Sequence, residues 1–492
     1  MSLHQAASPQ EPSTGCRECK RRRITCDRTL PSCKKCEKGG IECPRYGPKP
    51  FRWTNSIAVR GHSKGLSVPH YPPSPPAKRK RKRSDSREDE SSVTPQTAPA
   101  SSSTTTSPFQ MTELSSPTED DETLKFYIST VAPSNVWLDS DGNEYKRSIP
   151  HLAKRQPVLM MAIRAVCMRL MGADAALSDE ASNTAIIEIT QMIKPIVAQT
   201  TDATRAPHDV DFPDTERLEA LLASMLILSN HSLVSSNLAG ARSHREAART
   251  IVRCLRAGKA RKHALIDFLQ NQLAIYEVLA CTTLTNVEHI DAAILPEKRD
   301  DDVLFGEYIH ILHRVTLLSL QRSPSPTVYT RAQIIPDFQR QFELALGSTL
   351  LAAGPLIATA SKELRQDFIR TAHLYHHAGL LYTCERLRLG RVHEPWPTSA
   401  QRLFDILDEF QNITVQLYNL PWPLLIAGIV ASENPVWQRK VVDMFEWLTR
   451  DSHYEHYADV LAFCQELWAD PRRDWLVLAR EREESGASIV SV

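Results

Sequence analysis

CRECKRRRITCDRTLPSCKKCEKGGIEC, residues 16–43, holds six of the 11 cysteines in this chain of 492 residues. The unit Cys-x2-Cys-x6-Cys occurs twice in this stretch, offset by 17 residues. The first copy consists of Cys16, Cys19 and Cys26, and the second of Cys33, Cys36 and Cys43. Residues 1–15 are polar and contain no secretory signal, so we expect a reducing compartment in which these thiols bind metal rather than form disulfides.

The number of cysteines predicts a centre of two Zn²⁺ ions. Structural zinc takes four ligands in a tetrahedron, and a Cys-x2-Cys pair brings two thiolates to one metal across a tight turn. Two such ions can share six sulfurs only if two of the sulfurs bridge both metals. Because the two copies are equivalent, we expect one bridging sulfur from each copy. A disulfide framework and a two-zinc ribbon of another class are the alternatives.

The two copies differ in charge. The net charge of the whole chain is only +1, but residues 16–49 carry 11 Lys and Arg against 4 Asp and Glu. The first copy contains the row Lys20, Arg21, Arg22 and Arg23, where the second has the Gly-rich run 37–40. Cations bind phosphates, and guanidinium groups pair bidentately with guanine. We therefore predict that the first copy contacts double-stranded DNA. The second copy should act as a scaffold, with a phosphate contact from Lys34 or Lys35.

The cysteine spacing resembles that of the fungal binuclear zinc cluster family (Zn2Cys6). The resemblance implies that Cys16 and Cys33 are the bridging ligands. It assigns one zinc to Cys16, Cys19, Cys26 and Cys33, and the other to Cys33, Cys36, Cys43 and Cys16. It also implies that Arg22 and Arg23 approach the major groove and read a CGG-like triplet. Thr25 stands where the family usually has lysine, so one phosphate contact of the family has no counterpart here.

The same resemblance implies a function. We expect a nuclear regulator of RNA polymerase II transcription that is not an enzyme, with double-stranded DNA and the transcription machinery as partners. A homodimer is left open, because no heptad run follows the cluster. The alternatives are a DNA-tethered enzyme and an RNA-binding zinc module. Against the first, residues 123–492 gather no acid, base and nucleophile at a recognisable spacing. Against the second, residues 16–43 lack the aromatic side chains on which RNA readers stack bases.

Three regions are predicted along the chain: a zinc cluster domain over residues 14–46, a disordered linker over 60–122 and an α-helical regulatory domain over 123–492. The linker is rich in Ser, Thr, Pro, Asp and Glu, and so buries too little apolar surface to offset its ordering entropy. It contains a basic hexamer made of Lys78, Arg79, Lys80, Arg81, Lys82 and Arg83. The hexamer predicts a nuclear import signal, and a solvated charge run is the alternative.

Apolar residues in the last region recur with helical spacing. One stripe consists of Leu218, Leu221, Leu222, Met225 and Leu226. Further stripes run over residues 403–410, 437–448 and 457–468. Strand-like alternation is not evident, so an all-α domain is expected. His373, His376 and His377 also have helical spacing, but no acidic or cysteine partner lies beside them, and we interpret them as ordinary helix histidines.

Two helix starts can be predicted from capping patterns. Thr398 with Gln401 has the pattern of a capping box, and Asn434 with Pro435 has the pattern of an N-cap followed by proline at the first helical position. The segment 420–447 resembles the C-terminal part of the helical regulatory domain found in one branch of the family. No run of about 18 apolar residues occurs, so no membrane span is expected.

Overall fold

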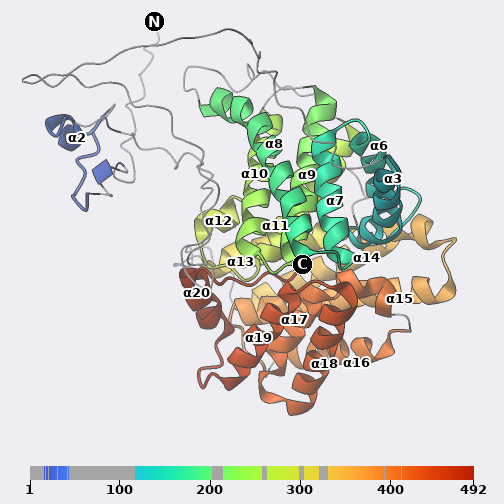
Figure 1. The fold of residues 1–492 in the computed structure, drawn as a ribbon. Helices are drawn as coiled ribbons and strands as arrows, with labels where there is room; N and C mark the ends of the chain where they lie inside the picture. Colours follow the sequence, from blue (N-terminus) through green and yellow to red (C-terminus); the bar gives the residue numbers. More distant parts are fainter. Residues whose placement is uncertain are drawn as a thin grey trace, which may run out of the picture. The chain divides into compact units, whose positions relative to one another are not determined.

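All regular secondary structure in the described part of the chain is helical, as the sequence predicts. The computed structural model (Figure 1) describes residues 16, 18–19, 22–29, 32–40, 43, 117–201, 214–257, 263–297, 304–320, 331–392, 394–411 and 413–492. The chain divides into two compact units, Met1–Thr105 and Thr106–Val492. Residues 60–116 of the predicted linker, with the hexamer Lys78–Arg83, lie outside the described residues.

Among its described residues, the first unit contains the short helix α2 (Lys34–Lys38), and Glu18 and Cys19 are also helical. The second unit comprises, in chain order, α3 (Pro117–Phe126), the π-helix η1 (Tyr127–Val131), α4 (Ala132–Ser134), α5 (Glu144–Arg147), α6 (Ile149–Ala153), α7 (Pro157–Leu170), α8 (Ala175–Thr201), α9 (Thr215–Val234), α10 (Leu238–Ala257), α11 (Ala264–Cys281), α12 (Val287–Asp291), α13 (Gly306–Leu320), α14 (Arg331–Ile357), α15 (Lys362–Arg386), α16 (Trp396–Glu409), the 3-10 helix η3 (Ile413–Asn419), α17 (Pro421–Val430), the 3-10 helix η4 (Ala431–Glu433), α18 (Pro435–Ser452), α19 (His456–Ala469) and α20 (Trp475–Ser485). None of the described helices is long and apolar enough to cross a bilayer.

We call α3 to α11 the first half of the second unit and α12 to α20 the other half. Helix α9 is buried at the centre of the first half, with α7 and α10 packed along it (Figure 1). The predicted leucine stripe on α9 is buried, but so is every other residue from Leu218 to Val234. Several polar side chains on the other faces form hydrogen bonds, which offset the cost of burying them. Asn230 Nδ2, for example, donates to Asn135 Oδ1 at 2.6 Å, and His231 Nε2 lies 2.8 Å from Ser178 Oγ.

The C-terminal end of α9 is held by the start of α19. The last carbonyls of a helix have no partner within the helix, so they need one from elsewhere. Glu455 N donates to Val234 O at 3.0 Å, and His456 Nδ1 lies 3.1 Å from Leu233 O. His456 is fully buried, and this burial lowers the pKa of its imidazole to about 3. A neutral histidine therefore links the two halves of the second unit.

Helix α17 is the buried centre of the other half, and all of its residues are buried. It packs against α15, α16, α18 and α19 (Figure 1). Trp422 stacks on Tyr375 of α15 with ring centroids 5.5 Å apart. At Gly428 the Cys464 side chain on α19 fills the space that a Cβ would need. The run that resembles the regulatory domain of the family is thus the packing core of this half.

The end of α11 joins the two halves through Thr282, the residue that caps this helix. The Thr282 carbonyl accepts from Arg386 Nη1 at 3.1 Å and from the Tyr382 hydroxyl at 3.4 Å, both on α15. Its hydroxyl accepts from Trp422 Nε1 on α17 at 3.1 Å. Arg386 also donates to Leu284 O at 2.6 Å. We call this set of bonds the Thr282 junction.

The predicted start of α18 is confirmed. Asn434 Oδ1 accepts from the backbone N–H groups of Val436 and Trp437 at 3.0 and 3.2 Å, and Pro435 is the first helical residue. Asparagine at this position satisfies two N–H groups that lack partners inside the helix, and proline has no N–H to satisfy.

The predicted capping box of α16 is wrong. Thr398 lies inside the first turn, where its hydroxyl donates to a carboxylate instead of accepting from a backbone N–H, and Gln401 also bonds to a side chain. The helix begins earlier, at Trp396, with Pro397 in its first turn, where proline is favoured. Trp396 Nε1 also donates to Glu385 Oε1 of α15 at 2.8 Å, which fixes this end of the helix against α15.

Helix α3 begins at Pro117, within the span predicted as linker. Proline suits the first helical position, and acidic side chains in the first turn suit the positive end of the helix dipole. Asp120 pairs with Arg164 of α7 at 2.6 Å, and Leu124 is buried. The sequence of this segment is polar and therefore predicts a linker, but the segment forms a helix whose Asp120 pairs with an opposite charge on α7.

Candidate metal centre and nucleic-acid interface

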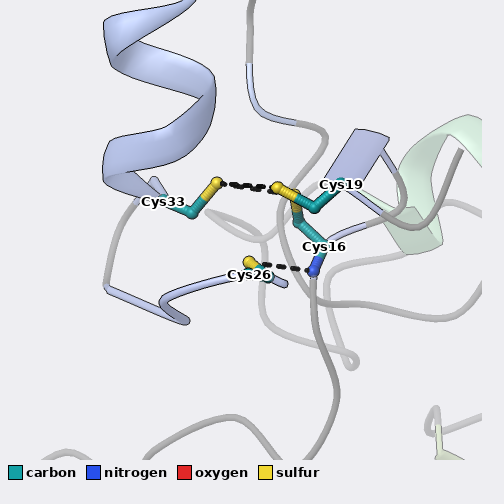
Figure 2. Close-up of side chains that lie close together, drawn as sticks. All are labelled: Cys16, Cys19, Cys26 and Cys33. Carbon is teal, nitrogen blue, oxygen red and sulfur yellow. Dashed lines mark hydrogen bonds between the residues drawn. The ribbon is translucent and has the colours of Figure 1, made fainter. Parts of the chain in front are cut away.

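The structure brings all six clustered cysteines together. Cys16, Cys19, Cys33 and Cys36 are buried, and Cys26 and Cys43 are half-buried. Their sulfurs form two groups of four, in each of which all sulfurs lie within 4.8 Å of one another. One group is Cys16, Cys19, Cys26 and Cys33 (Figure 2), and the other is Cys16, Cys33, Cys36 and Cys43. The two groups share Cys16 and Cys33, whose sulfurs are 3.6 Å apart.

The sequence duplication is visible in the backbone. Cys16 N donates to Cys26 Sγ at 3.4 Å, and Cys33 N donates to Cys43 Sγ at 3.5 Å. In each copy, the first amide therefore points at the sulfur ten residues later. Such N–H groups stabilise negative charge on sulfur and fix the sulfur's orientation.

The sulfurs fit a divalent metal chemically. Burial, together with hydrogen bonds from the neighbouring thiols, raises the pKa of Cys19 to about 12. This sulfur therefore becomes a thiolate at neutral pH only where a cation offsets the charge. Zn²⁺ prefers four thiolates in a tetrahedron, and each group offers four cysteine sulfurs within reach of one ion. The residues present thus suit zinc in both groups.

Asp27 connects the two copies, and sequence reasoning missed it. Its carboxylate accepts from the backbone N–H groups of Lys34 and Lys35 at 3.0 Å each, and from Thr29 N at 3.2 Å. The hydrogen bond from the Thr29 side chain is the main reason why the pKa of Asp27 lies below its ordinary value. Lys34 and Lys35 open α2, so Asp27 of the first copy caps the helix of the second. The available signal was Asp followed two residues later by Thr, a pattern typical of local side-chain turns.

The predicted DNA-contact residues lie on the surface where they are described. Arg22, Arg23, Lys34 and Lys35 are all exposed, and Lys20 and Arg21 lie outside the described residues. Arg23 has a φ of 55°, in the left-handed region that favours glycine. The equivalent residue of the second copy, 17 positions later, is Gly40, with a φ of 60°. Arginine therefore occupies a position where the duplicate has glycine.

Arg22 lies against the second copy. A Cβ on Gly39, the residue equivalent to Arg22, would lie 3.2 Å from Arg22 Nη1. The guanidinium thus passes over a backbone that has no side chain in the way. Gly39 also donates to the Cys36 carbonyl at 3.1 Å, which ends α2. The Gly-rich run predicted as scaffold therefore gives room to a basic side chain of the other copy.

Within the described residues, the two cysteine groups are the only side-chain clusters suited to hold a metal. His376 and His377 lie on α15 with ring centroids 5.1 Å apart, and they belong to no such cluster. Burial lowers the pKa of His377 to about 3, so its imidazole is neutral. These residues behave as helix histidines, in agreement with their interpretation from sequence.

Two family models match the chain. The Fungal Zn(2)-Cys(6) binuclear cluster domain matches residues 14–52, and the Fungal specific transcription factor domain matches residues 122–485. No curated protein and no solved structure matches. The first match covers the six cysteines and the exposed arginines, and the second covers nearly all of the helical unit. The chain therefore belongs to the fungal specific transcription factor family, as a zinc-binding, DNA-binding regulator with an N-terminal binuclear cluster domain.

Proposed function

We propose that the chain is a zinc-dependent, sequence-specific regulator of RNA polymerase II transcription that catalyses no reaction. The observation that carries this proposal is the contrast between the two cysteine copies. The first copy presents exposed Arg22 and Arg23 where the second has Gly39 and Gly40. Arg23 holds a backbone conformation that costs energy for any residue except glycine. Strained residues gather at functional sites, where a contact compensates for the cost.

In this proposal two zinc ions hold the first unit together, and Cys16 and Cys33 are each bonded to both. The ions offset the charge of the thiolates and supply folding energy rather than reactivity. Native mass spectrometry of the full chain should find two zinc ions. Cys33→Ser should release both, because the sulfur is shared, whereas Cys254→Ser on α10 should keep both. A single zinc ion in the parent chain would contradict the bridged arrangement.

The first copy is proposed to read a CGG-like triplet in the major groove. Guanine presents two acceptors there, N7 and O6, which match the paired donors of a guanidinium group. Arg22 and Arg23 are the proposed base contacts, and Lys20, Arg21, Lys34 and Lys35 the proposed phosphate contacts. Lys34 and Lys35 lie at the N-terminus of α2, but Asp27 already uses their backbone N–H groups. Their side chains, not the helix end, are therefore the groups available to phosphate.

Selection from random duplex DNA with the zinc-loaded full chain tests this assignment. We expect enrichment of CGG-like triplets. Arg23→Ala should cost about 1–3 kcal/mol on the best site and relax the preference at one base pair. Lys20→Ala should weaken all sequences equally and lower the salt dependence by about one unit. Lys38→Ala is the matched control in the second copy and should change little. The assignment of the two copies is reversed if Lys38→Ala relaxes base preference and Arg23→Ala does not.

The nucleus is the proposed location, and Lys78–Arg83 the proposed import signal. Replacing the hexamer with alanine should abolish nuclear accumulation of the full chain, because importers recognise clustered cations in accessible segments. The affinity of a fragment spanning residues 1–70 for its DNA site should stay the same, since the hexamer lies outside that fragment. Unchanged accumulation would leave the hexamer as a solvated charge run. The transcription machinery is the proposed partner. A homodimer is a further proposal, in which each copy of the chain would bind one of two paired DNA sites.

A further inference from the structure

Helix α10 carries a row of arginines along one face. The row consists of Arg242, Arg245, Arg249, Arg253 and Arg256, spaced three or four residues apart. That spacing places side chains on the same face of a helix. Two members are used in packing, because Arg253 and Arg256 donate to the backbone carbonyls of Ala292 and Leu295 at 2.5 and 3.1 Å. Arg249 forms an ion pair with Glu277 of α11, its Nε lying 2.5 Å from Oε2.

Arg245 is different. It is only 4% exposed, and among the described residues its buried Nη1 has no hydrogen-bond partner. Arginine is almost never buried without a partner, because desolvating a charged group is expensive. The nearby carboxylate of Glu277 is already engaged by Arg249. Burial correspondingly lowers the pKa of the Arg245 guanidinium. Nη1 of Arg245 is therefore a donor that the described residues leave unused.

Arg245 lines a cavity of about 30 Å³ between α10, α11 and residue Val490. A space of this size holds about two water-sized groups, enough for the two oxygens of a carboxylate, because about 10–15 Å³ suffices for one water, and the cavity opens to solvent. The polar wall contains three guanidinium groups and two carboxylates, those of Arg242, Arg245, Arg249, Glu246 and Glu277, with the imidazole of His289 beside them. The charged groups leave an excess of one positive charge. The remaining wall includes Ala280, Leu284 and Val490, which are apolar.

We propose that this cavity is a binding site for a small carboxylate, whose head group pairs with Arg245 and whose carbon chain lies against Leu284 and Val490. A carboxylate carries one negative charge and accepts charge-assisted hydrogen bonds from guanidinium N–H groups. Its charge balances the excess in the cavity. A phosphate monoester carries about two negative charges at neutral pH and would leave the site over-neutralised. The site is separate from the zinc cluster, and the proposal does not depend on DNA binding.

Thermal unfolding of the zinc-loaded full chain tests the proposal. Sodium acetate, propionate and butyrate should each raise Tm in a saturable way relative to sodium chloride of equal ionic strength. Propionate and butyrate should act at lower concentration than acetate, because the apolar wall contacts their carbon chain. Sodium phosphate should give no saturable shift beyond that of chloride. The proposal is overturned if no carboxylate exceeds chloride, or if phosphate raises Tm as strongly as the carboxylates do.

Two variants and one control locate the effect. Arg245→Met should abolish the carboxylate-dependent rise, yet leave the Tm of the ligand-free protein equal or higher, since an apolar side chain replaces a buried ion. A purely structural arginine would instead lower Tm when replaced. Arg242→Gln, at a half-buried position, should weaken the carboxylate response several-fold even if Arg245→Met fails to fold. Arg256→Gln removes the same charge from the same helix outside the cavity and should keep the full response. Parent-like responses in both cavity variants would overturn the assignment.

Discussion

The left-handed backbone at Arg23 leads to a prediction that separates stability from DNA recognition. A non-glycine residue in this region lowers the stability of the fold by roughly 1–2 kcal/mol, and glycine avoids this strain. Glycine also has more freedom in the unfolded chain, which cancels roughly 0.5–1 kcal/mol of the stability gained. Because Arg23 has a φ of 55°, the zinc-binding unit should be more stable in the Arg23→Gly variant than in the Arg23→Ala variant, by about 0.5–1 kcal/mol. Both variants should lose about 1–3 kcal/mol of DNA-binding free energy, because both lack the guanidinium group.

Competition with a zinc chelator measures the stability difference, since zinc binding and folding are coupled in such small units. Because both zinc ions leave together in the bridged arrangement, a gain of 0.5–1 kcal/mol corresponds to about a 1.5- to 2.3-fold higher chelator concentration for half-removal of zinc. The matched control is Gly40→Ala, because a Cβ there meets no atom within 4 Å and adds only backbone strain at a φ of 60°. It should lower zinc retention while DNA binding by the metal-loaded protein is unchanged. Lower zinc retention in Arg23→Gly than in Arg23→Ala would refute the strain argument.

Three further predictions concern the helical unit. Lowering the pH from 7 to 5 should lower the free energy of unfolding by about 2 kcal/mol through His456, because the unfolded histidine takes up a proton near pH 6.5 and the folded one only near pH 3. Urea unfolding at the two pH values should show a smaller loss of stability in His456→Gln than in the parent chain. An equal loss in both would exclude this histidine as the cause. Gly428→Ala should destabilise by about 1–3 kcal/mol through overpacking, whereas Gly347→Ala in α14, where a Cβ meets nothing within 4 Å, should stabilise by about 0.5–1 kcal/mol. Asn434→Ala should cost about 0.5–2 kcal/mol as a lost cap, and Thr398→Ala, which removes no cap, should cost clearly less in the same unfolding experiment.

The fold class and the grouping of the cysteines could be predicted because both depend on short-range patterns. Ligand number and the repeat of 17 residues indicate that each copy supplies one shared sulfur, and the resemblance to the zinc cluster family implies which sulfurs these are. The cap of α18 was predictable for the same reason, since Asn434 and Pro435 act within one turn of themselves. The contacts of Asp27 were harder to foresee, because its carboxylate bonds to backbone groups seven and eight residues away.

What could not be predicted depends on neighbours distant in the chain. The start of α16 lies at Trp396, where Pro397 stands in the first turn and Glu385 on another helix accepts from the Trp396 side chain, rather than at the pattern around Thr398. The leucine stripe of α9 predicted one buried face, but neighbouring helices bury the whole helix from Leu218 onward. The arginines of α10 have the spacing of an ordinary solvated face. Only the packing of α10 against α11 buries Arg245 and leaves it without a hydrogen-bond partner on Nη1 among the described residues.

The Thr282 junction has a consequence for how the helical unit opens. Its hydrogen bonds join the end of α11 to α15 and α17, so the last turn of α11 cannot separate from either helix without breaking the bonds of a buried carbonyl and a buried hydroxyl. A group that stays buried without a partner in a partly open state costs about 1–3 kcal/mol, whereas in a fully open state water satisfies it. Fluctuations that open one half alone are therefore suppressed, and the two halves form one cooperative unit. Backbone amides in the middle of α9 and of α17 should then exchange with solvent through the same global opening, with equal protection free energies.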